Sequence, residues 1–203
     1  EIADPQSVLF SAPLLALAAL DPRPSLAAMD RAVFAMLFAG GAAVILIFRD
    51  RGWHWGGAVI AALAFAFGAA ASWRIQHLSQ LFSLCWWPIA WWLLARALDR
   101  GSIGYGIAAG LAAALMVLGR DQVAMLLAYL LAATVVHHWI SAKRIGPAVR
   151  ASIAPLGAAS IAGALVVTGP VLMSALWGME SNRVVIDEIG AGRGSLHPAH
   201  LLT

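Results

Sequence analysis

The sequence predicts an all-α membrane protein, a polytopic transmembrane helix bundle of about six spans with one short interfacial or re-entrant helix. Hydrophobic residues make up 62% of the 203 residues, charged residues only 11%, and the mean hydropathy is +0.83. Soluble domains carry about 25% charged residues, so this chain has too little polar surface for a soluble domain. Its apolar runs also reach membrane length and are separated by short polar segments.

The first apolar run is predicted not to cross the membrane. Residues 7–20 are apolar, but this run is shorter than the roughly 17–25 residues that a span needs. Pro22 and Pro24 end it, and Ser25 is a suitable N-cap for the helix that follows. We therefore expect residues 7–20 to form the interfacial or re-entrant helix.

Six spans are predicted to follow, and a polar outer segment, residues 178–203, ends the sequence. The third span should kink at Pro88 and the sixth at Pro170. The chain opens without an initiator methionine, so we expect residues 1–203 to be a single transmembrane domain within a longer chain. The predicted spans are residues 26–48, 56–73, 81–98, 103–119, 123–140 and 151–177.

The orientation follows from the basic residues. The segments 49–55, 96–102 and 141–150 hold seven of the 13 lysine and arginine residues but only two of the ten acidic ones. The other side holds the remaining basic residues among most of the acids. Cytoplasmic loops carry an excess of lysine and arginine, so we predict that these three segments are cytoplasmic and that both ends of the sequence are outside.

The candidate site residues all fall on the predicted outer side. No aspartate, glutamate, lysine or arginine lies in the middle of a predicted span, which is where ion carriers and proton relays place such groups. The polar chemistry is therefore expected at one membrane surface, where a lipid-linked phosphate would also lie. The candidates are Asp4, Gln6, Arg74, Gln76, His77, Gln80, Arg120, Asp121, Gln122 and Arg183.

The polar stretch of residues 72–80 holds four of these candidates. If it starts a helix, Trp73, His77 and Gln80 share one face, with Arg74 close by. Guanidinium, imidazole and carboxamide groups together suit phosphate and sugar hydroxyls. The alternative is an ordinary interfacial loop with a snorkelling Arg74 and an anchoring Trp73.

The remaining sequence features indicate helix packing or argue against a metal site. Small residues at Gly40, Gly68, and Gly106 with Gly110 are expected to let helices approach closely. The single cysteine, Cys85, excludes a disulfide framework and a thiol-based metal site within this sequence. Pro198 disrupts the helical spacing that His197 and His200 would need to bind a metal, so no metal site is predicted.

Several short motifs resemble one family. Asp4-Pro-Gln-Ser-Val-Leu-Phe-Ser-Ala-Pro13, and Arg74-Ile-Gln-His-Leu-Ser-Gln80 followed by Trp87-Pro88, resemble outer segments of the YfhO-like bacterial membrane proteins of the GT-C glycosyltransferase superfamily. Gly119-Arg-Asp-Gln122 is similar to that family's Gly-x-x-Gln turn, although its middle pair is more often His-Pro. Ser181-Asn-Arg183 and Ser195-Leu-His-Pro198 resemble the outer segment before the next span.

The resemblance implies a function at the outer face of the bacterial inner (plasma) membrane. It implies inverting transfer of a sugar from a polyprenyl-phosphate donor to an envelope glycan or lipid acceptor. In the superfamily a carboxylate in the first outer loop activates the acceptor hydroxyl, in some members with a divalent cation. Asp4 is the residue of this sequence that could stand near that role, and the true base could also precede residue 1.

The remaining roles follow from side-chain chemistry. Arg74, Arg120 or Arg183 would meet the phosphate, while His77 and glutamine side chains would orient sugar hydroxyls. Two rivals stay open: a lipid-carrier transporter or flippase, and a non-catalytic envelope-assembly protein. The transporter needs a polar path between spans, which only Ser160, Thr168 and Ser174 suggest. The expected partners are the lipid bilayer, the donor and the acceptor, with no nucleic acid.

Overall fold

The computed structural model describes residues 10–119 and 121–179, and this part of the chain consists of helices and connections, without strands. It confirms the all-helical class. Elements that lie in the described ranges follow the order α1 Ala12–Leu20, α2 Leu26–Asp50, α3 Trp55–Phe67, α4 Ala69–Ser72, α5 Leu78–Arg100, α6 Ile103–Val117, α7 Gln122–Ile140 and α8 Ile145–Met179.

Five helical segments in the described ranges are long and apolar enough to cross a membrane, which supports a multi-pass membrane protein. A sixth, α6, is apolar but shorter, and it packs most extensively against α8 and α5. The five segments are Leu26–Asp50, Trp55–Ser72, Leu78–Arg100, Gln122–Ile140 and Ile145–Leu176.

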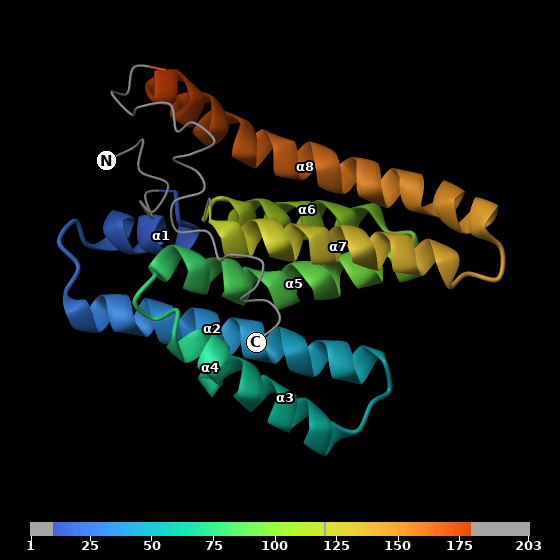
Figure 1. The fold of residues 1–203 in the computed structure, drawn as a ribbon, viewed down its shortest axis with the longest axis horizontal. Helices are drawn as coiled ribbons and strands as arrows, with labels where there is room; N and C mark the ends of the chain where they lie inside the picture. Colours follow the sequence, from blue (N-terminus) through green and yellow to red (C-terminus); the bar gives the residue numbers. More distant parts are fainter. Residues whose placement is uncertain (1–9, 120, 180–203) are drawn as a thin grey trace, which may run out of the picture.

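Helix α1 has the length expected of a helix that does not span. Its 9 residues rise about 14 Å at roughly 1.5 Å per residue, whereas the hydrocarbon core is about 30 Å thick. Asp21 ends it, with its backbone N–H donating to the carbonyl of Leu17. The helix lies beside the start of α2 (Figure 1). This agrees with an interfacial or re-entrant element, although it begins at Ala12 and residues 7–9 lie outside the described range.

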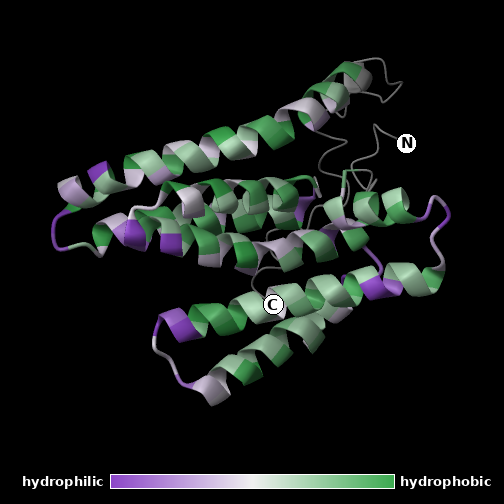
Figure 2. Cartoon of the chain, turned by 180° about the vertical axis from the view of Figure 1, so that it is seen from behind, coloured by the Kyte–Doolittle hydropathy of each residue, from purple (hydrophilic) through white to green (hydrophobic). Residues whose placement is uncertain are grey.

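The long helices alternate in direction, so their connections gather at two ends of the bundle (Figure 1). We call the end that holds residues 51–54, 101–102 and 141–144 the basic end, and the other the opposite end. Hydrophilic residues gather near the ends, while the lengths of the helices are mostly apolar (Figure 2). The opposite end holds residues 21–25, 73–77, 118–119 and 121.

Helix α5 is the centre of the bundle. It contacts α2, α6, α7 and α8, and half of the residues in its most apolar 18-residue stretch are buried. Leu81 and Cys85 pack with α2 near the opposite end, and Leu94 and Leu98 pack with α6 and α7 further along. By contrast, only 6% of the most apolar 18-residue stretch of α8 is buried. Most of the apolar surface of this helix therefore faces outward, as expected in lipid.

Several predicted boundaries differ from the structure. Helix α8 starts at Ile145 and not at residue 151, because Pro147 lies in the first turn, where no backbone N–H bond is lost. Helix α5 is longer than residues 81–98 at both ends. The span predicted at 56–73 is broken into α3 and α4 at Gly68, whose backbone is extended (φ −71, ψ 166).

Three of the predicted close approaches between helices at small residues are present. A Cβ on Gly40 would lie 2.7 Å from the ring of Phe65 in α3 and 3.1 Å from the carbonyl oxygen of Cys85 in α5. A Cβ on Gly106 would lie 2.3 Å from the carbonyl oxygen of Pro155, and one on Gly110 would lie 2.1 Å from that of Ala159. Only glycine therefore permits the approach of α6 to α8. Gly68 differs from the prediction, because its hypothetical Cβ meets Ala64 of the preceding helix, so it marks a helix break.

Candidate functional site

At the opposite end, the start of α5 and the α6–α7 turn are joined by a polar contact. The hydroxyl of Ser83 lies 2.8 Å from Oδ2 of Asp121 and 2.9 Å from the carbonyl oxygen of Met116. Its single proton serves one of these acceptors at a time. Oδ1 of Asp121 accepts from the backbone N–H of Ala124 and so caps α7. Two of the segments predicted to form the site therefore converge.

Gly119 lets this turn pack closely on α5. A Cβ at this position would lie 2.2 Å from Oγ of Ser83 and 3.0 Å from the carbonyl oxygen of Ser79. Any larger residue would push the turn away from α5. The glycine of the Gly-x-x-Gln motif thus has a steric role, and Asp121 has a structural one as the helix cap.

Arg74 follows α4 and folds back on it. Its Nη1 donates to the carbonyl oxygen of Ala70 at 2.9 Å, which satisfies one of the free carbonyls at a helix end. Its Nε–H is shielded from solvent and has no hydrogen-bond partner within the described ranges. An unpaired buried donor is unfavourable, so this nitrogen would gain from a bound acceptor such as a phosphate oxygen.

The other candidates on this stretch do not form the helical face that was predicted. Residues 73–77 form a turn, and α5 begins only at Leu78 with His77 as its N-cap. Trp73, His77 and Gln80 therefore do not share one helix face. Gln76, His77 and Gln122 are exposed, and Gln80 is half-buried. No hydrogen bond in the described ranges joins the side chains of these candidates to one another. Asp4, Gln6, Arg120 and Arg183 lie outside the described residues.

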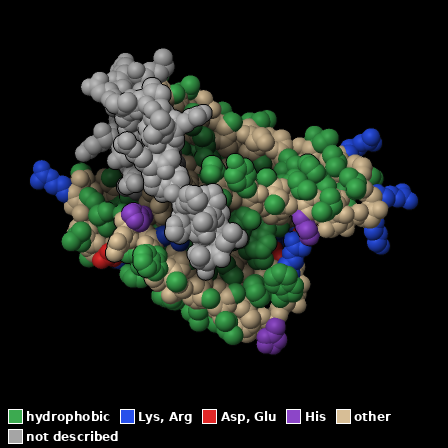
Figure 3. All heavy atoms as spheres, in the orientation of Figure 1, with side chains coloured by type: hydrophobic (Ala, Val, Ile, Leu, Met, Phe, Trp, Pro, Cys, Tyr) green, Lys and Arg blue, Asp and Glu red, His purple; other side chains and the backbone are tan. Residues whose placement is uncertain are grey.

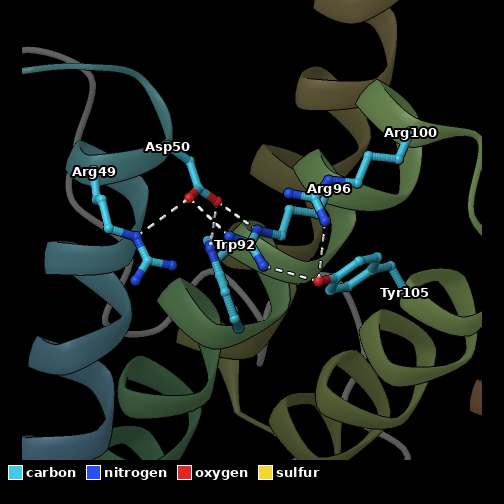
Figure 4. Close-up of polar contacts among 6 residues, drawn as sticks. All are labelled: Arg49, Asp50, Trp92, Arg96, Arg100 and Tyr105. Atoms are coloured by element: carbon cyan, nitrogen blue, oxygen red, sulfur yellow. Dashed lines mark hydrogen bonds and ion pairs between the residues drawn. The ribbon is translucent and has the colours of Figure 1, made fainter.

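A polar network at the basic end was not predicted from the sequence. Nε and Nη2 of Arg96 in α5 both donate to the carboxylate of Asp50 in α2, and the indole of Trp92 donates to the same group at 2.8 Å. Nη1 of Arg96 donates to the hydroxyl of Tyr105 in α6 at 2.8 Å. Figure 4 shows these side chains, which tie α2, α5 and α6 together.

The network carries a weak sequence signal. Trp92, Arg96 and Arg100 are spaced i, i+4 and i+8, so they share a face of α5. Arg96 also lies over the ring of Trp92, at 4.6 Å from its centroid. The partner Asp50 is 46 positions away, and no local pattern identifies it. The bidentate pair is a structural tie, because its donors and acceptors already satisfy one another.

Trp87 and Trp91 stack on each other, with ring centroids 5.3 Å apart and an interplanar angle of 13°. Both pack against the α5–α6–α7 core, so they fill space between helices. The Nε1–H of Trp87 is shielded and has no partner in the described ranges. Trp53, Trp55 and Trp73 are exposed near helix ends, where interface anchors are expected.

An apolar groove of about 450 Å³ runs between α5, α6, α7 and α8. It extends as far as Val117, the last residue of α6, and so approaches the turn that carries Gly119 and Asp121. Nearly all its lining side chains are alanine, glycine, valine or leucine. A lipid chain fits such a surface better than a polar ligand. The described residues contain no cluster of three or more histidine, cysteine, aspartate or glutamate side chains that could hold a metal ion.

Comparisons with known proteins found no matching protein-family model, no matching curated protein and no matching solved structure. Membership of the YfhO-like family therefore stays a prediction from the motifs of the sequence.

Proposed function

We propose that this chain is part of a glycosyltransferase-like membrane protein that moves a sugar from a polyprenyl-phosphate donor to an envelope acceptor at the outer face of the bacterial plasma membrane. One observation carries the proposal. An apolar groove along the bundle extends to Val117, close to the turn where α5 and the α6–α7 connection converge. A polyprenyl tail would lie in the groove, and the phosphate and sugar would lie at the opposite end.

The chemistry needs two kinds of group at that end. A carboxylate, Asp4 or one that precedes residue 1, takes the proton of the acceptor hydroxyl. Guanidinium groups stabilise the negative charge on the departing phosphate. Arg74 suits this second task because its shielded Nε–H still lacks an acceptor within the described ranges. Asp121, whose two oxygens are already engaged, acts by positioning the turn.

The transporter alternative finds less support in the side chains. The hydroxyls of Thr168 and Ser174 donate to the carbonyl oxygens of Ala164 and Pro170 on their own helix. Hydroxyls bonded in this way offer little to a polar headgroup crossing the membrane. Ser160 lies in the lining of the apolar groove and is not enough for a path. The non-catalytic assembly role makes a different prediction, because it requires no transfer.

The test is a reconstitution of the full-length protein in liposomes with a panel of polyprenyl-phosphate sugars and a bacterial envelope extract as acceptor. Release of polyprenyl phosphate would be measured for the wild type, for Arg74→Gln and for the control Arg144→Gln at the basic end. Losing a charge-assisted contact costs roughly 1.5–3 kcal/mol, so we expect Arg74→Gln to slow transfer about ten- to a hundred-fold and the control to be unaffected. A parallel reaction with a chelator separates cation-assisted from cation-independent transfer.

Two outcomes would count against the proposal. Absence of transfer with every donor, from a protein that is folded and inserted, would favour the assembly role. Transfer that is unchanged in Arg74→Gln would remove Arg74 from the site and leave it as a helix-end cap.

A further inference from the structure

A polar cavity of about 230 Å³ lies at the basic end, between the ends of α2, α5 and α7. It is separate from the candidate site, which is at the opposite end of the bundle. Arg51 lines it from the α2–α3 connection, Asp99 from α5, and His137, His138 and Ser141 from the end of α7. Side chains from three elements that are distant in the sequence therefore meet around one space.

The groups in this cavity are only partly paired. Nδ1 of His138 lies 3.7 Å from the carboxylate of Asp99, and Nε2 of His137 lies 3.2 Å from the hydroxyl of Ser141. The guanidinium of Arg51 makes no hydrogen bond or ion pair with any residue in the described ranges. Arginine is the side chain best suited to hold a phosphate through two parallel hydrogen bonds.

The surroundings of the cavity are positively charged. The other acid of this end, Asp50, is already neutralised by the bidentate contact with Arg96. Lysine and arginine side chains project from the basic end, and a histidine lies next to basic side chains on its near face (Figure 3). Asp99 is the one acid among the described residues that line the cavity, and its carboxylate forms an ion pair with His138 when that imidazole is protonated.

We propose that this cavity binds the phosphate headgroup of an anionic phospholipid from the leaflet at the basic end. A basic pocket between membrane helices at the headgroup level is the setting in which anionic lipids are recognised. Pockets that enclose drug-sized ligands have volumes of about 300–1,000 Å³. This cavity is smaller, so it suits a headgroup whose acyl chains remain outside. Ala95 and Leu98 of α5 belong to the lining and give the cavity an apolar side.

The proposal is independent of the glycosyltransferase assignment, because it concerns the other end of the molecule. It is tested on the purified full-length protein in detergent by titration with phosphatidylglycerol or phosphatidylcholine, with bound lipid counted by native mass spectrometry. We expect one phosphatidylglycerol per chain at low lipid concentration. Arg51→Gln should weaken this binding about tenfold or more, as expected for a lost charge-assisted contact.

Arg144→Gln is the matched control, since it removes the same charge at the same end from a residue that does not line the cavity. It should leave the affinity for phosphatidylglycerol within about twofold. His138→Gln is a second variant within the cavity and should also weaken binding, although less than Arg51→Gln. Thermal unfolding of each variant, measured without lipid, separates loss of binding from loss of fold.

Three results would overturn the proposal. Equal affinity for phosphatidylcholine would show that the cavity does not distinguish an anionic headgroup from a zwitterionic one. Equal losses in Arg51→Gln and Arg144→Gln would assign the effect to a diffuse basic surface. Displacement of the lipid by an equal concentration of inorganic phosphate or glycerol phosphate would show a site for a free phosphate compound in place of a lipid.

Discussion

The pair formed by Asp50 and Arg96 links two helices that lie far apart in the sequence. Their side chains are 26% and 15% exposed, so solvent screens the pair less than it screens a surface ion pair. The guanidinium also donates to Tyr105, which brings α6 into the same network. Removing one partner would leave the other charge half-buried without its hydrogen bonds, and this loss is the main cost of such a change.

We predict that Arg96→Gln destabilises the protein by about 1.5–3 kcal/mol. Arg49→Gln is the control, because Arg49 contacts the same carboxylate at 3.6 Å but is 57% exposed, and it should change stability by less than about 0.5 kcal/mol. Reversible unfolding in mixed micelles, followed by tryptophan fluorescence, measures both. Equal effects of the two substitutions would show that Arg96 is no more than a surface charge.

The network around Asp50 and Arg96 could not be predicted from the sequence, for a physical reason. Each charged residue stands near a predicted span end, where snorkelling into water is the ordinary expectation. The pairing of Asp50 with Arg96 depends on the angle between α2 and α5, which no local pattern encodes. At the opposite end, by contrast, the tight turn around Gly119 and Asp121 was predicted from the sequence, since a short polar segment between two apolar runs leaves few alternatives.

At the scale of the helices, the contact between α6 and α8 depends on glycine. The backbone of α8 approaches Gly106 and Gly110 so closely that no Cβ fits at either position. Helices in lipid associate through such close packing, because burial of apolar surface adds little there. The α6–α8 contact is also the most extensive between any two helices in the described part of the chain, so its loss would affect the position of the whole of α8.

Gly110→Ala is expected to destabilise the protein by about 1–3 kcal/mol, the usual cost of overpacking. The matched control is Gly157→Ala in α8, where an added Cβ meets nothing within 4 Å. That change should be neutral or stabilising by up to about 1 kcal/mol, because alanine is the better helix former. The same unfolding assay compares them. If Gly110→Ala were as stable as Gly157→Ala, the close approach of α6 to α8 would be wrong.

The helices themselves were largely predictable, and their boundaries less so. Hydropathy dominates in a chain with this composition, so the order of the apolar elements follows from the sequence. Their number does not follow fully, because α6, predicted as one of six spans, is shorter than the five candidate spans in the described ranges. The boundaries depend on local detail. Gly68 interrupts one predicted span, while Pro147 does not delay the start of α8. A proline in a first turn and one in a helix interior look alike in the sequence but differ in the hydrogen bond that they remove.

For the molecule as a whole, the two ends have different chemistry. The opposite end holds Arg74, His77, Gln80 and the turn at Asp121, and the apolar groove approaches it. The basic end holds the Asp50–Arg96 network and the cavity at Arg51. Sugar transfer from an outward-facing donor requires the opposite end to face outside. The excess of basic residues predicts that the basic end lies in the cytoplasm, and this prediction agrees with that requirement.

The orientation of the bundle is therefore the premise of the proposed function, and labelling of single cysteines in intact cells tests it most directly. In a Cys85→Ser background, a cysteine at the exposed position Gln76 should react with a membrane-impermeant maleimide. A cysteine at the exposed position Ser141 should react only after the cells are opened. Labelling of position 141 from outside, with position 76 protected, would contradict the account by placing the proposed site in the cytoplasm.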